Sequence, residues 1–128
     1  MLSDAVIGRL KDTCRPPLRL VDGLLELAGA PSPPQVPAAY VLPSSESAEP
    51  NLKIGADRPL QRIVEMIEVV LVARAGTSLD SLRDVVRDAL RGWAPEGVEP
   101  LEYRGAAIID IKAGEVWRAL RFEAVTFV

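Results

Sequence analysis

Apolar residues occupy both alternating sets of positions along Leu60–Arg74, which has the sequence LQRIVEMIEVVLVAR. This pattern is typical of a strand that is covered on both faces, and it predicts the central strand of a sheet. A helical period follows over Ser78–Arg91, with Thr77 or Ser78 as the N-cap and Gly92 at the end. The buried stripe predicted for this helix consists of Leu79, Leu82, Val86, Ala89, Leu90 and Trp93.

Weaker elements separated by prolines are predicted in the first half of the chain. Leu2–Thr13 carries an apolar stripe and predicts a helix that ends before two prolines. A short extended stretch then leads into a weak helix predicted over Asp22–Ala28. Ala38–Leu42 is predicted as a strand, and the prolines on either side of it favour an edge position. The polar segment Ser44–Pro59 is predicted as a long loop.

A β-hairpin is predicted from residues 101–112 and 115–128, with its turn at Ala113–Gly114. Because residues 113 and 114 form the turn, the numbers of any two opposed residues sum to 227. This register places apolar side chains on one face and charged side chains on the other, and a slip of one residue would mix them. Two opposite-charge pairs result across the strands, Arg104 with Glu123 and Lys112 with Glu115. The face predicted to join the core consists of Leu101, Tyr103, Ala107, Ile109, Ile111, Val116, Leu120, Phe122 and Ala124.

The other face of the predicted hairpin is charged, but it also carries five apolar residues, Ile108, Trp117, Ala119, Val125 and Phe127. Two or three helices can cover only one face of a small sheet, so the apolar residues on the other face are predicted to meet another subunit. The predicted subunit interface consists of Trp117, Arg121, Glu123, Val125 and Phe127. The alternative is a sheet that curls around a second small core of its own.

Together these elements predict an α/β (α+β) fold. It consists of one mixed or antiparallel sheet of about four strands, with two to three helices packed on one face. A strand order of 1-2-4-3 would make every neighbouring pair antiparallel. At 128 residues, the chain is expected to form a single domain over residues 1–128.

Composition removes several function classes. The chain has no histidine and one cysteine, which excludes Ser-His-Asp and Cys-His catalysis and the histidine- and cysteine-rich metal sites. We therefore predict no catalytic residue, no metal site and no cofactor. The net charge of -3 argues against a basic surface that grips nucleic acid. No apolar run approaches the roughly 20 residues of a membrane helix, and no signal-peptide core is present, so cytoplasmic synthesis is expected.

Four side chains remain candidates for an unusual environment. Asp110, within IIDIK, is expected to be a solvated or paired carboxylate beside Lys112 rather than a general acid. Glu65 and Glu68 on the central strand are each expected to pair with an arginine across a subunit boundary. Cys14 is expected to act as a small apolar filler rather than as a reactive thiol.

Four stretches stand out for their order and spacing: PAAYVLP at 37–43, VVLVAR at 69–74, LRDVVRDALRGWAPEG at 82–97 and LEYRGA at 101–106. In this order, and over almost the whole chain, the sequence resembles the tail terminator family of tailed bacteriophages. The resemblance implies a non-enzymatic virion protein with a small α/β fold. Such proteins form a ring, usually hexameric, on the head-proximal end of the tail tube, stop its polymerisation and offer a surface for head joining.

The resemblance also implies partners and a location. The partners would be further copies of the chain, the tail tube protein and a head-completion or connector protein, with DNA passing only through the lumen and no membrane. The location would be the virion tail, assembled in the host bacterial cytoplasm. Within the predicted loop, Leu52, Lys53 and Ile54 are hypothesised to dock on the tail tube, and a merely disordered connection is the alternative.

Two other functions stay open from the sequence. One is another phage neck component, either a head-tail connector or a tail completion protein of similar size and fold. The other belongs to a different class, a small dimeric α/β domain that binds a ligand or catalyses a reaction.

Overall fold

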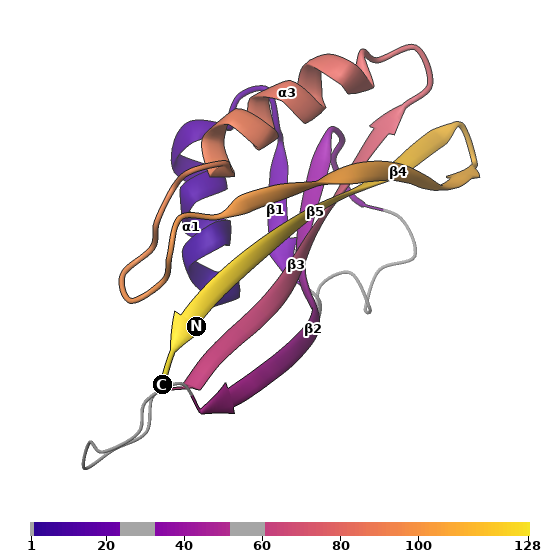
Figure 1. Cartoon of the computed structure of the whole chain (residues 1–128). Coiled ribbons are helices and arrows are strands. Elements are labelled where there is room, and N and C mark those ends of the chain that lie inside the picture. Colours follow the sequence, from indigo (N-terminus) through magenta and orange to yellow (C-terminus); the bar gives the residue numbers. More distant parts are fainter. Residues whose placement is uncertain (1, 24–32, 52–60) are drawn as a thin grey trace.

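The computed structural model describes residues 2–23, 33–51 and 61–128 (Figure 1). Its strands form one sheet in the order β1-β2-β3-β5-β4, in which the β1–β2 pair is parallel and the other neighbours are antiparallel. The predicted α+β fold is confirmed, and the four predicted strands keep the order 1-2-4-3. The elements are α1 (Leu2–Thr13), β1 (Leu20–Gly23), β2 (Ala38–Asn51), β3 (Gln61–Arg74), α3 (Leu79–Leu90), β4 (Glu102–Lys112) and β5 (Glu115–Phe127).

Strand β1 was not predicted, and it adds a fifth strand to the sheet. It pairs in parallel with the start of β2, from Leu20 opposite Ala38 to Gly23 opposite Val41. The helix predicted from Asp22 is therefore wrong at its start, because Asp22 belongs to this strand. The remainder of that predicted helix lies outside the described residues.

Strand β2 differs from its prediction in position and in length. The segment Ala38–Val41 is internal, because β1 covers its outer side, so the predicted edge position is wrong. The predicted loop is also wrong from Ser44 to Asn51, where the chain continues to pair with β3 through two register shifts. Residues 44–50 are mostly exposed and polar, so the strand structure here is specified by backbone pairing rather than by apolar alternation. Residues 52–60 lie outside the described part.

Helices α1 and α3 pack on one face of the sheet, which we call the helix face (Figure 1). Helix α3 begins as predicted, because the Ser78 side chain accepts a hydrogen bond from the backbone N–H of Ser81. The buried residues on this face are Val6, Leu10, Cys14, Leu18, Val21, Ala39, Val41, Ile67, Val69, Leu71, Ala73, Leu82, Val86, Leu90, Leu101, Leu120, Phe122 and Ala124.

The opposite face, which we call the second face, has a smaller core of its own. Strand β3 is therefore buried on both sides from residue 69 to residue 73, as expected of a central strand. The buried residues of this second core are Ala38, Tyr40, Val70, Val72, Trp117 and Ala119.

The β4–β5 hairpin keeps the predicted register only next to its turn. Lys112 lies opposite Glu115 as predicted. Bulges at Ile109 and at Arg104 then shift the register of β4 against β5, so the pairs farther from the turn differ from the prediction. The core positions predicted for Ala107, Ile109 and Ile111 are wrong, since all three side chains are exposed. The bulge at Ile109 accounts for Ala107 and Ile109, whereas Ile111 keeps its predicted partner Val116 and is 69% exposed near the turn. Gly105, beside the second bulge, has a φ of 122°, a conformation that favours glycine.

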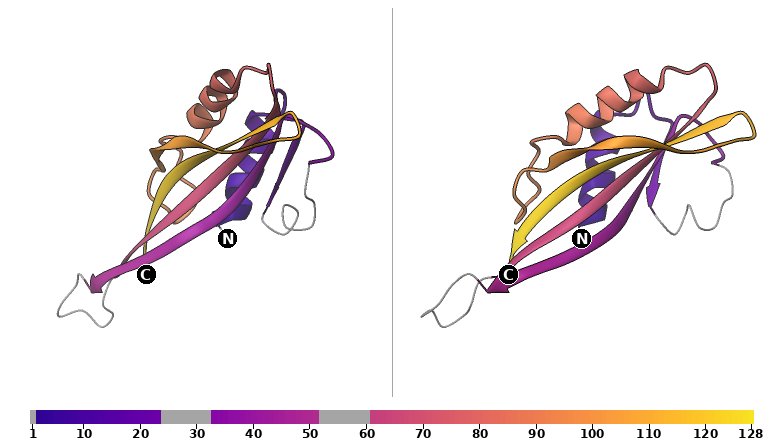
Figure 2. Two further views of the ribbon diagram at one scale, coloured as in Figure 1. Left: turned by 90° about the vertical axis from the view of Figure 1, so that its right-hand side faces the viewer. Right: turned by 45° about the vertical axis from the view of Figure 1, so that its right-hand side comes forward.

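The sheet extends well past the helices at one end. Figure 2 shows β2 and β3 continuing together beyond the helical layer. We call residues 43–51 of β2 and 61–66 of β3 the arm. None of the arm residues whose burial is described is buried. The prediction that the whole central strand is covered on both faces therefore holds for its second half only.

Candidate functional site

Trp117, the largest residue of the predicted subunit interface, lies inside the second core. It is 6% exposed, and the ammonium group of Lys112 lies 4.6 Å from the centre of its ring. Within the described residues its indole Nε1 has no hydrogen-bond partner. The exposure expected for Trp117 is therefore wrong, and the alternative of a second small core applies to this residue.

The other four residues of the predicted interface follow Trp117 along the same face of β5, beyond the second core. Arg121 approaches the Glu68 carboxylate at 3.6 Å, and Arg104 Nε donates to Glu123 at 2.6 Å. Val125 is half-buried, and Phe127 is 45% exposed. The structure thus brings these four side chains into one row, of which Glu123, Val125 and Phe127 lie beside the part of β3 that belongs to the arm.

A second apolar group was missed by the sequence reasoning. Ile108, Ile109 and Ile111 are each more than half exposed near the turn of the β4–β5 hairpin. Strict alternation had placed Ile108 on the charged face and Ile109 and Ile111 on the core face, and the bulge at Ile109 changes the register of Ile108. Ile111 keeps its predicted partner Val116, so its exposure does not come from the bulge. A run of three isoleucines within four residues was the available signal, since large exposed apolar side chains in proximity indicate contact surfaces.

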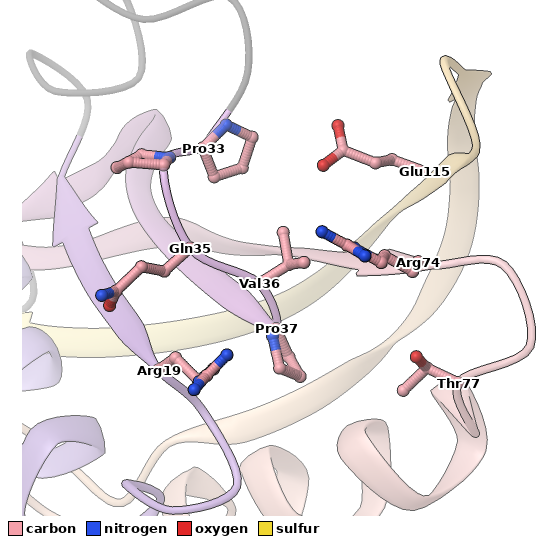
Figure 3. A pocket seen from close by; sticks show the side chains of 9 residues that line it. Arg19, Pro33, Gln35, Val36, Pro37, Arg74, Thr77 and Glu115 are labelled. Atoms are coloured by element: carbon pink, nitrogen blue, oxygen red, sulfur yellow. The ribbon is translucent and has the colours of Figure 1, made fainter.

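A hollow of about 360 Å³ opens where β1, β2, β3 and β5 meet near that turn (Figure 3). Arg19 and Arg74 contribute positive charge, and Glu115, the register partner of Arg74, contributes negative charge. No sequence pattern indicated this pocket, because its residues come from four separated segments. Its lining residues are Arg19, Pro33, Pro34, Gln35, Val36, Pro37, Arg74, Thr77 and Glu115.

The arm carries a pair of like charges. Glu46 of β2 lies directly opposite Glu65 of β3 in the register. Burial raises the pKa of Glu65, and the neighbouring charge of Glu46 raises it further. Glu68, in contrast, pairs with Arg121 of the same chain, so its predicted partner across a subunit boundary is not needed.

The remaining candidates, Asp110 and Cys14, have the paired and buried environments that were expected of them. Asp110 forms an ion pair with Lys112 at 3.5 Å, as expected for a paired surface carboxylate. Cys14 is fully buried, and burial raises the pKa of its thiol, so little reactive thiolate forms. Residues 2–23, 33–51 and 61–128 contain no group of three or more potential metal ligands of the His, Cys, Asp and Glu types. No helix among them has the length and apolar character required to cross a membrane.

Comparison with known proteins identifies the family. The family model described as phage tail terminator protein matches residues 2–128. The chain belongs to the phage tail terminator family. A solved structure titled "Virion of native gene transfer agent (GTA) particle" contains a chain of similar fold, with a TM-score of 0.66 and 18% sequence identity over 99% of this chain and 95% of the other. No protein with a curated description matches.

Membership of the tail terminator family gives the chain a structural, virion-associated role in the phage tail. The resemblance found in the sequence is thereby confirmed. The surfaces that stand out in the described part of the chain are Phe127 at the end of the row on β5, the isoleucine group, the charged pocket and the projecting arm. The predicted tube-docking residues Leu52, Lys53 and Ile54 lie outside the described residues.

Proposed function

We propose that this chain caps the head-proximal end of a phage tail tube as a homo-oligomeric ring. The ring ends tube polymerisation and offers the surface to which the head-completion or connector protein binds. The observation that supports this function is the family match over residues 2–128. We expect a hexamer in which residues 1–128 form the domain of each subunit, assembled in the host cytoplasm, with DNA passing through its lumen.

The row on β5 is our proposed subunit contact. Phe127 and Val125 supply apolar area that has no core of its own chain on that face, while Arg121 and Glu123 are already paired within the chain. Burying apolar area stabilises association by about 25 cal/mol per Å². Because Arg121 and Glu123 already have partners within the chain, the contact can form beside them without burying an unpaired charge. Trp117 supports the row from the second core rather than contacting the neighbour.

The segment that joins the two strands of the arm in the sequence is our proposed contact with the tail tube. The arm extends past the helices (Figure 2), and in the sequence Leu52, Lys53 and Ile54 belong to the segment between its two strands. A projecting two-stranded element can reach a second ring while the helices and both cores stay with the body of the subunit.

The direct test of capping is electron microscopy of purified chain mixed with tail tubes. Density on one end of the tubes, with tubes that no longer elongate when tube protein is added, is the expected result. Binding only to heads that carry a portal, with free tube ends left bare, would instead identify a head-tail connector. Replacing Leu52, Lys53 and Ile54 by serine should abolish binding to the tube while the ring itself stays intact in sedimentation.

The proposed subunit contact is tested by Phe127→Asp. A carboxylate at a contact that excludes water should dissociate the ring at micromolar concentration, as measured by sedimentation velocity. Val85→Asp is the matched control, because Val85 is 36% exposed on α3 and lies outside the row on β5. An intact ring in the Phe127 variant, or equal dissociation in both variants, would remove this contact from the proposal.

A further inference from the structure

The two ends of the sheet carry complementary features that do not meet within one chain. One end is the arm. The other, which we call the turn end, is where β3 finishes at Arg74 and the Ala113–Gly114 turn joins β4 to β5. Glu65 and Arg74 are nine positions apart on β3, which corresponds to about 30 Å along a strand.

The arm has an excess of negative charge. Directly opposed residues of an antiparallel pair have Cβ atoms about 4.5–5.5 Å apart, so Glu46 and Glu65 repel each other. The arginine on the same stretch of β3 is not available to them, because Arg62 pairs with Glu49. In the described part of the chain neither Glu46 nor Glu65 takes part in an ion pair. A cation supplied from outside the chain would relieve this repulsion.

The pocket at the turn end has an excess of positive charge. Two arginines and one glutamate line it, so one positive charge is not balanced by the lining. Figure 3 shows the Arg19 and Arg74 side chains on two sides of the hollow, with Val36 and Pro37 between them. At about 360 Å³ the hollow has the size of ligand pockets, about 300–1,000 Å³, and two guanidinium groups are suited to bind carboxylates in a bidentate manner.

Exposed apolar side chains are concentrated at the same two ends. In the described residues, five of the six large hydrophobic side chains that are exposed lie there. Ile108, Ile109 and Ile111 lie near the turn end, whereas Phe127 and Val128 lie at the end of β5 that runs beside the arm. Apolar area would therefore accompany the charges on both sides of a contact between the ends.

We propose that Glu46 and Glu65 on the arm of one copy dock against the Arg19–Arg74 pocket of the next copy. Because two different surfaces of the same chain meet, the contact is head-to-tail and can repeat around a ring. It rests on the proposed function in so far as that function requires a ring. The middle of the arm contacts the neighbouring subunit, which leaves residues 52–54 for the tail tube.

The test uses charge reversal in the full chain, with sedimentation velocity as the readout. Glu65→Arg cancels the negative charge of the Glu46–Glu65 pair, and Arg19→Glu changes the net charge of the pocket lining from positive to negative. Each variant alone should therefore self-associate at least about tenfold more weakly than the wild type. Mixing the two variants should restore association to within about threefold, because the unchanged arm then meets the unchanged pocket and the introduced arginine meets the introduced glutamate. The double variant should recover for the same reason.

The matched controls are Glu96→Arg and Arg91→Glu, which reverse the same charges at exposed positions that have no ion pair in the described part of the chain. Wild-type association in both controls, together with weak singles and a restored mixture, supports the contact. Single variants that associate like the wild type, a mixture that stays dissociated, or a wild-type chain that is monomeric at all concentrations overturns it.

Tube capping separates this inference from the proposed function. If the wild-type ring caps tubes and the charge-reversal variants still form it, the result supports the proposed function and contradicts the contact. If the ring depends on these charges but leaves tubes uncapped, the result supports the contact and contradicts the proposed function.

Discussion

Strand β3 is one continuous strand with two different halves. From Ile67 to Ala73 nearly every side chain is buried, in the helix-face core or in the second core. From Gln61 to Met66 the same kind of alternation continues, with Ile63, Val64 and Met66, yet no side chain is buried. The backbone pairing with β2 and β5 persists along both halves.

The difference shows that apolar character alone does not define a core. In the second half of β3, helices and a second small core supply the other layer of packing, and burial of each apolar side chain can stabilise the chain by about 1.5–3 kcal/mol. In the arm, no second layer is present within the described chain, so the same residue types contribute little to its stability. Apolar residues without a partner layer in one chain are the ones available for contact with another.

Thiol reactivity should show the largest difference between the covered part and the arm. Cys14 packs in the helix-face core, and its thiol pKa is raised by burial, so labelling requires the core to open. A cysteine placed in the arm by Ser47→Cys, in a Cys14→Ala background, should react with Ellman's reagent at least about 10³-fold faster than Cys14, because opening a core costs several kcal/mol. Comparable rates would mean that the covered half opens as freely as the arm.

Truncation on the helix face of β3 should show the next largest difference. Leu71→Ala empties part of a fully buried site and should lower the free energy of unfolding by about 2–5 kcal/mol, measured by urea denaturation. Ile63→Ala is the control on the same face of the arm, where about 1 kcal/mol or less is expected because Ile63 is only half-buried. Equal losses would show that the arm has a packing layer as complete as that of the body.

The elements with a strong hydrophobic period were predictable from the sequence. The stripe of Ser78–Arg91 specified α3, and the two apolar sets of β3 specified a central strand, because burial imposes these periods directly. The arm of β2 was not predictable in this way. Its exposed face needs no apolar residues, so a paired strand in that position has the composition of a loop.

The candidate site was less predictable, for reasons of register. Two bulges in β4 changed which side chains share a face, and alternation cannot locate a bulge in advance. The ion pair of Arg104 with Glu123 was nevertheless predicted, because long side chains reach across a shift of two residues. The pocket depended on segments brought together by the fold, such as Arg19 before β1 and Thr77 after β3, which no local pattern connects.

A valine-to-threonine substitution can be made on the second face in both halves of β3, which allows a direct comparison of the two. Val72→Thr places a hydroxyl in the second core and should lower the free energy of unfolding by about 1–3 kcal/mol, because the hydroxyl loses its bonds to water. Val64→Thr puts the same group on the half-buried arm, where it stays hydrated and the change should be within about 0.5 kcal/mol. A loss at Val64 as large as that at Val72 would indicate that the arm is covered in solution, and its dependence on protein concentration would show whether another copy covers it.

The smallest effect is expected from Glu65, where the two halves differ in charge rather than in packing. Its folded-state pKa lies above the ordinary value of 4.5, so the carboxyl favours folding below that pH and this contribution is lost as the pH rises through the folded-state pKa. Glu65→Gln removes the repulsion with Glu46 and should stabilise the dissociated chain at pH 7 by about 0.2–1 kcal/mol, with less effect at about pH 4.

Glu68→Gln is the matched control for that last substitution, since Glu68 is three positions along the same strand but faces Arg121. Removing a paired charge should give no gain at pH 7. Urea denaturation of both variants at the two pH values decides the matter: equal changes at Glu65 and Glu68 would contradict an unrelieved like-charge pair on the arm. If the gain from Glu65→Gln vanishes at concentrations where the chain associates, the repulsion is relieved by the neighbouring copy, because only then does a cation from outside the chain reach the arm.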